Sequence, residues 1–312
     1  MHSLIATVAT GVLLLLQAGG LDFALGGVSL TLAIAVAFVG LPHGALDHRV
    51  GKKILCALPP VLGFVAFFAS YLAVATVVLL GWYVAPLLTT VVFFGLSAWH
   101  FGLEEDERTE RTRLQWAAMV SRGGMVIWIP IIFQGAEINE LLAMILPSPN
   151  AAVGAYIVGA IQLMVPVLIA LTIIDAYSFS IPGRTQVLGI SAAWQHRIRV
   201  CAFAVLFAIA HPLVSFGLYF CGWHSIRGLM HLHQQFGGSF SRFSLSLVPI
   251  SAAAIALFAV GFLVQLTSVQ ITPSIIRTVF VGLSAVAIPH LLLHVLSDSL
   301  AVGITRKAGA AV

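Results

Sequence analysis

The sequence predicts an all-α fold: a polytopic membrane bundle of about eight to ten transmembrane helices, forming one integral-membrane domain over residues 1–312. Two features of composition support this class. Hydrophobic residues make up 60% of the chain and charged residues only 8%, and the mean hydropathy is +1.06. Soluble domains carry roughly a quarter charged residues, and no polar block in this chain is long enough for an extramembrane domain.

Apolar segments of spanning length follow one another along the chain. The first five are residues 4–18, 28–41, 54–82, 87–101 and 114–133. The first segment has neither a basic flank nor a small-residue cleavage site, so we expect a retained span rather than a signal peptide. Residues 141–146 are too short to cross a bilayer, whereas residues 151–174 are long enough.

The second half of the chain is less regular. A polar, aqueous loop is expected over residues 182–199, and the apolar residues 200–220 that follow contain His211-Pro212. Proline lacks the amide hydrogen and its ring clashes with the preceding turn, so a kink is expected there. Two more spans are predicted at residues 245–264 and 275–296.

Basic residues in short loops predict the orientation of the chain. They follow the second and fourth spans and should be cytoplasmic, together with the N-terminus: Arg49, Lys52, Lys53, Arg108, Arg111 and Arg113. The protein is therefore predicted to be a multi-pass protein of the cell membrane. The net charge of +4 reflects few acids rather than many bases, so no nucleic-acid partner is expected. Three cysteines without metal-site or disulfide spacing are predicted to be packing residues: Cys56, Cys201 and Cys221.

Histidines in or beside apolar segments are the main functional signal. Nine of the eleven have this placement: His43, His48, His100, His211, His224, His231, His233, His290 and His294. Ionisable groups at membrane depth are costly and usually pair or bind a ligand inside the bundle. Imidazoles from several helices suit Fe, Zn, Cu or Ni, whereas the scarcity of intramembrane carboxylates argues against a bridged di-iron site.

Spacing along helices selects among these histidines. His43 and Asp47 are four residues apart in GLPHGALDH, so they share a helical face, and the carboxylate can support a ligand imidazole. His290 and His294 are also four apart, in IPHLLLH. His100 ends an apolar helix just before a run of acids, and an interfacial residue is the alternative interpretation.

The remaining histidines carry weaker signals. His224 follows an aromatic run, which indicates that it lines a site. Three other histidines are second choices as metal ligands: His211, His231 and His233. His2 and His196 lie near polar ends and are expected to play no part.

Aromatic residues surround two of the selected histidines. Trp99 and Phe101 flank His100, and Phe220 and Trp223 precede His224. Each stripe alone is more often ordinary helix packing. Because both are centred on histidines, we interpret the four as lining a channel for a long apolar molecule.

Four motifs of this chain resemble those of the Brp/Blh family. They are PHGALDH at 42–48, SAWHFG at 97–102, FCGWHS at 220–225 and PHLLLH at 289–294. The resemblance runs over nearly the whole chain in the same order. Members of this family are membrane β-carotene 15,15′-dioxygenases, in which histidine-bound Fe²⁺ uses O₂ to split the central double bond of β-carotene. The resemblance implies two molecules of all-trans-retinal as products, with a rhodopsin as the downstream user of the retinal.

By motif, the resemblance implies that His43, His100 and His224 are iron ligands. The family's fourth ligand lies four residues after the WHS histidine, and this chain has Gly228 there. The fourth ligand could be His290, His294 or water. His290 is favoured because Pro289 could bend the backbone and bring it inward. Asp47 is then expected to support a ligand histidine, and Arg227 and Glu104 or Glu105 are weaker supports.

Two other classes of protein remain as alternatives. A membrane di-iron desaturase or hydroxylase also uses many histidines, but it needs several HxxxH and HxxHH boxes, and this chain has one HxxxH and no adjacent pair. A non-enzymatic histidine-rich transporter or a haem protein would use the histidines as a proton path or as axial ligands.

Overall fold

The computed structural model describes residues 25–104, 112–178, 192–266 and 270–309. All regular elements in these ranges are helices, which confirms the predicted all-α membrane class. Six helical segments are long and apolar enough to cross a membrane, and a bent pair over residues 113–133 makes a seventh if it is counted as one span. The six are Leu25–Ile54, Pro60–Val84, Pro86–Glu104, Val158–Tyr177, Phe240–Leu266 and Ile271–Ser297.

The described residues account for six or seven of the predicted eight to ten spans. Residues 4–18 lie outside the described residues. The predicted span at 200–220 is divided among α11 (Ala192–Ile209), α12 (Pro212–Gly217) and η2 (Leu218–Ser225). The break falls at His211-Pro212 as expected, and His211 Nδ1 accepts a hydrogen bond from the Leu213 amide at 3.3 Å. His211, a second choice as a ligand, therefore caps a helix.

The described residues cluster into two compact units, each assembled from separate stretches of the chain. The first unit comprises the described residues within Met1–Leu32 and Thr90–Arg227, and the second comprises those within Ala33–Thr89 and Gly228–Val312. Two helices cross the boundary between the units along the chain. In α2 (Leu25–Ala35) the boundary follows Leu32, and in α13 (Ile226–Phe236) it follows Arg227.

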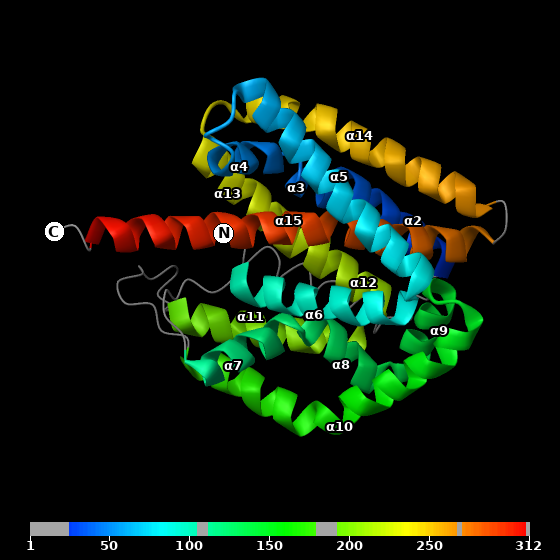
Figure 1. Cartoon of the computed structure of the whole chain (residues 1–312). Coiled ribbons are helices and arrows are strands. Elements are labelled where there is room, and N and C mark those ends of the chain that lie inside the picture. Colours follow the sequence, from blue (N-terminus) through cyan, green and yellow to red (C-terminus); the bar gives the residue numbers. More distant parts are fainter. Residues whose placement is uncertain (1–24, 105–111, 179–191, 267–269, 310–312) are drawn as a thin grey trace. The chain divides into compact units, whose positions relative to one another are not determined.

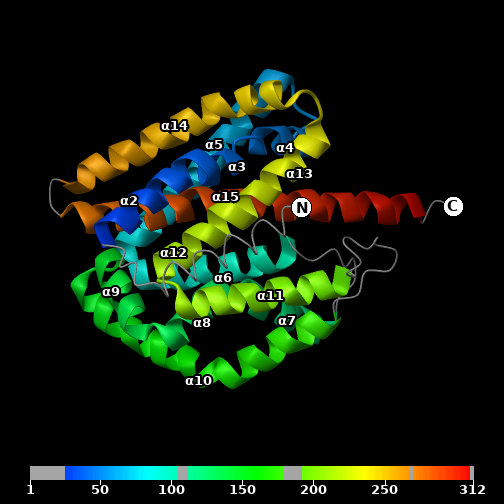
Figure 2. The ribbon, with the colours of Figure 1, turned by 180° about the vertical axis from the view of Figure 1, so that it is seen from behind.

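The first unit is built around a long helix, α10 (Ser148–Ser178). It packs against α7 (Arg113–Gly123), α8 (Met125–Phe133), α9 (Gly135–Ile145) and α11, as Figures 1 and 2 both show. The unit also holds most of α6 (Pro86–Glu104). Its core is rich in aromatic side chains, among them Phe101, Phe203, Phe207, Tyr219 and Trp223.

The predicted span at 114–133 is two helices rather than one. α7 begins with a capping box, in which the Thr112 hydroxyl accepts from the Gln115 amide and the Gln115 side chain accepts from the Thr112 amide. The chain then bends by 60° between α7 and α8, at Gly124. A Cβ on Gly123 would lie 2.1 Å from the Ala98 carbonyl oxygen and 2.3 Å from the Gly102 amide, so α6 and α7 meet backbone to backbone. Only glycine fits this crossing.

The second unit is built around α15 (Ile271–Gly309). It packs against α4 (Asp47–Ile54), α5 (Pro60–Val84) and α14 (Phe240–Leu266), while α14 also contacts α3 (Leu41–His43). Leu46, Leu232 and Phe243 form one buried cluster, and Val50, Phe67 and Leu293 form another. Only 6% of the apolar window of α14 is buried, as expected for a helix that faces lipid.

Two π-helical segments interrupt these helices, each near a histidine motif. η1 (Val36–Gly40) leads into α3, and the Leu41 amide bonds to the Val36 carbonyl five residues earlier. η2 contains FCGWHS itself. Such wide turns rotate the following residues around the helix axis and are frequent at functional sites. They determine which face His43 and His224 occupy.

Candidate metal centre

The first unit brings together two of the predicted ligands. His100 lies near the end of α6, and His224 lies in η2 and is only 4% exposed. Their ring centroids are 5.2 Å apart with the planes at 73°. Phe101 and Phe220 pack on the His224 ring, with centroid distances of 4.8 Å and 5.6 Å. The two imidazoles therefore lie in a largely apolar surrounding.

A carboxylate orients His224. Glu104 is the last residue of α6, four residues after His100, and its Oε2 lies 2.5 Å from His224 Nδ1. A carboxylate at Nδ1 holds a proton on that nitrogen, so the ring presents Nε2 to a metal. Glu104, expected only as a weak support, is thus the direct partner of a predicted ligand.

The second unit holds the other half of the predicted set. Asp47 is 5% exposed, and both of its carboxylate oxygens lie 2.9 Å from His290 Nδ1. The His290 ring lies 5.1 Å from the His43 ring and 4.5 Å from the His294 ring. Asp47, His290 and His294 each offer a ligand atom, and these atoms lie within 4.8 Å of one another.

The local backbone differs from the expected single helix through His43 and Asp47. α3 ends at His43, and Gly44 to Leu46 form a turn before α4 begins at Asp47. In this turn the Gly44 and Ala45 amides bond to the Leu41 and Pro42 carbonyls at 3.2 Å and 3.1 Å. Both His43 and Asp47 still reach His290, but through this turn rather than along one helical face.

Gly228 has a specific packing role beside His43. A Cβ built on Gly228 would lie 1.9 Å from His43 Cε1 and 2.1 Å from His43 Nδ1. The imidazole therefore occupies the space that any side chain at position 228 would need. This is the position at which the resemblance implies a histidine.

The other predicted residues have varied surroundings. Trp99 is half-buried on α6. Trp223 is 5% exposed and packs on Phe203, with the Arg199 and Arg227 guanidinium groups 5.0 Å and 6.0 Å from its ring. His231 is exposed, and His233 packs against Phe240 and Phe243.

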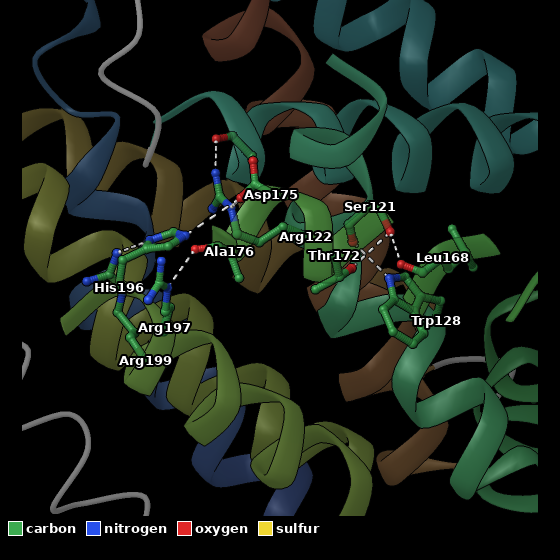
Figure 3. A network of polar contacts seen from close by, with 11 residues as sticks. Ser121, Arg122, Trp128, Leu168, Thr172, Asp175, Ala176, His196, Arg197 and Arg199 are labelled. Carbon is green, nitrogen blue, oxygen red and sulfur yellow. Dashed lines mark hydrogen bonds and ion pairs between the residues drawn. The ribbon is translucent and has the colours of Figure 1, made fainter. Parts of the chain in front are cut away.

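His196 contradicts the sequence prediction. It was expected at a polar end within an aqueous loop, yet residues 192–199 are the start of α11, and His196 is only 1% exposed. It lies between Asp175 and Arg199 in a buried polar network (Figure 3). His2 lies outside the described residues.

The donor set fits a first-row metal such as iron. Two buried histidines each have a carboxylate at Nδ1, and each has a second imidazole within a centroid distance of 5.2 Å. Neutral imidazole nitrogens oriented in this way are suitable ligands for Fe²⁺.

Comparison with known proteins gives consistent matches. The model of the family described as "Beta-carotene 15,15'-dioxygenase" matches residues 34–297. A protein named "Beta-carotene 15,15'-dioxygenase" from an uncultured marine bacterium, 66A03, is 27% identical over 263 residues, which cover 83% of this chain and 90% of that protein. One named "Probable beta-carotene 15,15'-dioxygenase Blh" from Halobacterium salinarum is 24% identical over 266 residues, covering 75% and 76%. No solved structure matches the chain.

Proposed function

Because this chain belongs to the beta-carotene 15,15'-dioxygenase family, we propose that it cleaves the central double bond of β-carotene with O₂. The central C=C bond breaks, and each half receives one oxygen atom, so two molecules of all-trans-retinal form. The resemblance of the four histidine motifs and the names of the relatives support this reaction. We further propose that residues 1–312 act as one dioxygenase domain.

The proposed cofactor is Fe²⁺, held by His43, His100 and His224 with His290 as the fourth ligand. When bound, it would supply the activation of O₂. The observation that carries the proposal is the pairing of His224 with Glu104 and of His290 with Asp47, since both carboxylates engage Nδ1. In both pairs the carboxylate would keep the proton on Nδ1, so Nε2 is the ring nitrogen that would bind the metal.

The aromatic residues would handle an apolar substrate. Phe101 and Phe220 contact the His224 ring, so we assign them to the central carbons of the polyene and to the exclusion of water. Trp99 and Trp223 complete the proposed lining. The six long apolar helices of the described residues fit a protein that takes β-carotene directly from the lipid bilayer, in the cell membrane. Retinal released there would be available to a rhodopsin.

Co-expression in carotene-producing cells tests the reaction. Cells that carry this protein should lose their yellow-orange colour and accumulate retinal, as measured by chromatography. Cells that carry the His224→Ala variant are the control. Unchanged carotene with well-expressed wild-type protein would refute the proposed reaction.

Spectroscopy of the purified protein separates the other classes. One iron per chain without a Soret band is expected. A Soret band would indicate a haem protein, and two irons per chain would indicate a desaturase or hydroxylase. A metal-free and inactive wild-type protein would favour a transporter.

Glu104→Gln and Asp47→Asn are expected to weaken iron binding by about 10–100-fold, the usual cost of removing a partner of a ligand histidine. Both substitutions keep the size of the side chain and remove the charge that holds the Nδ1 proton. Metal titration of purified variants measures the effect. Glu140→Gln is the matched control, because Glu140 is exposed on α9. Wild-type affinity in both variants would contradict the assigned role of the carboxylates.

A further inference from the structure

A second group of buried ionisable residues lies in the first unit, outside the proposed ligand set. Arg122 Nε donates to Asp175 Oδ2 at 2.5 Å, and His196 Nε2 lies 3.7 Å from the same oxygen. Arg199 Nη2 lies 3.0 Å from His196 Nδ1. Arg122, Asp175 and His196 are 5%, 0% and 1% exposed. Figure 3 shows these four residues as one chain of contacts, which we call the Arg122 network.

The contacts determine the protonation of His196. A guanidinium can only donate hydrogen bonds, so His196 Nδ1 accepts from Arg199. The proton of the neutral ring is then on Nε2, which faces Asp175. At 3.7 Å this contact is longer than a hydrogen bond, so His196 and Asp175 interact through charge and dipole.

The two ends of the Arg122 network reach the elements that carry His100 and His224. At one end Arg122 Nη2 donates to the Gly102 carbonyl oxygen at 2.9 Å, midway between His100 and Glu104 on α6. At the other end the Arg199 guanidinium lies 5.0 Å from the Trp223 ring, and Trp223 directly precedes His224 in η2. The network thus connects α6 with η2 through α7, α10 and α11.

Stability alone does not account for this arrangement. Removing a charged pair from water costs several kcal/mol per ion, and well-packed apolar pairs are often at least as stable. The α6–α7 crossing is already held by backbone contact at Gly102 and Gly123. What the Arg122 network adds is a defined orientation, because the planar guanidinium engages a carboxylate and a carbonyl at fixed angles.

We propose that the Arg122 network positions His100 and His224, so that the two imidazoles keep the spacing and tilt a shared metal requires. These four are positioning residues. Arg122 contacts the Gly102 carbonyl and Arg199 contacts the Trp223 ring, while Asp175 and His196 join the two arginines. This role rests on the proposed function, since it concerns the geometry of the proposed metal site.

The test uses a double variant that removes the charges but keeps the fold. Arg122→Met with Asp175→Leu replaces the buried pair by apolar side chains of similar size, so the unfolding temperature should stay close to that of the wild type. The kcat for retinal formation should fall about 10–100-fold, because misplacement by about 1 Å can cost this much, while KM stays within about twofold. The visible bands of the Co²⁺-loaded variant, which report coordination geometry without turnover, should shift.

Two further variants test whether the loss of kcat depends on the guanidinium and on the contacts to α6 and η2. Arg122→Lys keeps the charge but lacks the planar fork, so an intermediate kcat is expected. Ser121→Ala with Thr172→Val is the matched control. It removes a buried polar contact on the same two helices, α7 and α10, that involves neither α6 nor η2. Wild-type kcat and an unchanged Co²⁺ spectrum are expected for this control.

The outcomes separate the two proposals. If the wild type binds Co²⁺ and forms retinal, and the double variant does the same with unchanged kcat and spectrum, the positioning role is overturned while the proposed function stands. Equal losses of kcat in the double variant and the Ser121/Thr172 control would likewise overturn it. If the wild type neither binds metal nor forms retinal, the proposed function fails, and the positioning role fails with it.

Discussion

Replacing His224 with alanine is expected to abolish iron binding and retinal formation. His224 is buried, its Nδ1 contacts Glu104, and its ring lies beside His100 and two phenylalanine rings. Losing a partner of a ligand costs about 10–100-fold in affinity, and losing the ligand itself should cost at least as much. Iron per chain and the retinal formed by purified protein are the measurements. His43→Ala and His100→Ala are expected to behave in the same way.

The control for this prediction is His231→Ala. His231 is exposed on α13, so its removal leaves the candidate site intact, and iron content and activity should match the wild type. If any of the three ligand variants retains one iron per chain and full activity, that histidine is not a ligand.

Gly228→Ala is expected to displace the His43 imidazole and cause nearly complete loss of bound iron. The added methyl group would lie 1.9 Å from His43 Cε1, so the ring has to rotate away. The clash involves one side chain rather than backbone, and the protein should therefore still fold. Iron content, retinal formation and the unfolding temperature are measured together.

Gly222→Ala is the matched control, because a Cβ at Gly222 has no atom within 4 Å. A second comparison uses the His43→Ala background, in which Gly228→Ala should no longer change the unfolding temperature because its partner is gone. If Gly228→Ala retains wild-type iron and activity, His43 does not depend on the space at position 228.

Gly228→His extends this test to the departure from the family pattern. It introduces the same steric conflict, yet it also adds the imidazole that the resemblance implies at this position. More bound iron in Gly228→His than in Gly228→Ala would show that a ligand at position 228 can compensate for the displaced ring. Equal loss in both variants would show that this site depends on His43 in its present position.

The sequence was sufficient for the fold class, and it singled out histidines that the structure places near one another, such as His100 and His224. Apolar segments identify spanning helices because lipid imposes one requirement on every residue of a span. Histidines such as His43 and His224 were identifiable because an imidazole within such a segment is unusual. The spacing of Asp47 predicted a helical face shared with His43, whereas its carboxylate contacts His290 on α15.

The sequence was not sufficient where position depends on contacts between distant segments. The burial of His196 results from the packing of α10 and α11 around Asp175, which no local pattern reveals. The sequence around Gly123 does not show that a side chain at this position would clash with the backbone of α6. The π-helical segments before His43 and around His224 likewise depend on the surrounding packing rather than on a sequence signal.

The buried pair of Arg122 and Asp175 can form only late in the synthesis of the first unit. The two residues are 53 positions apart, so the arginine leaves the ribosome well before its partner. At about 5–20 residues per second, the delay is roughly 3–10 s. An unpaired arginine at the centre of a span costs about 2.5–3.5 kcal/mol in membrane insertion. Arg122 can therefore form its ion pair with Asp175 only after α10 has been synthesised.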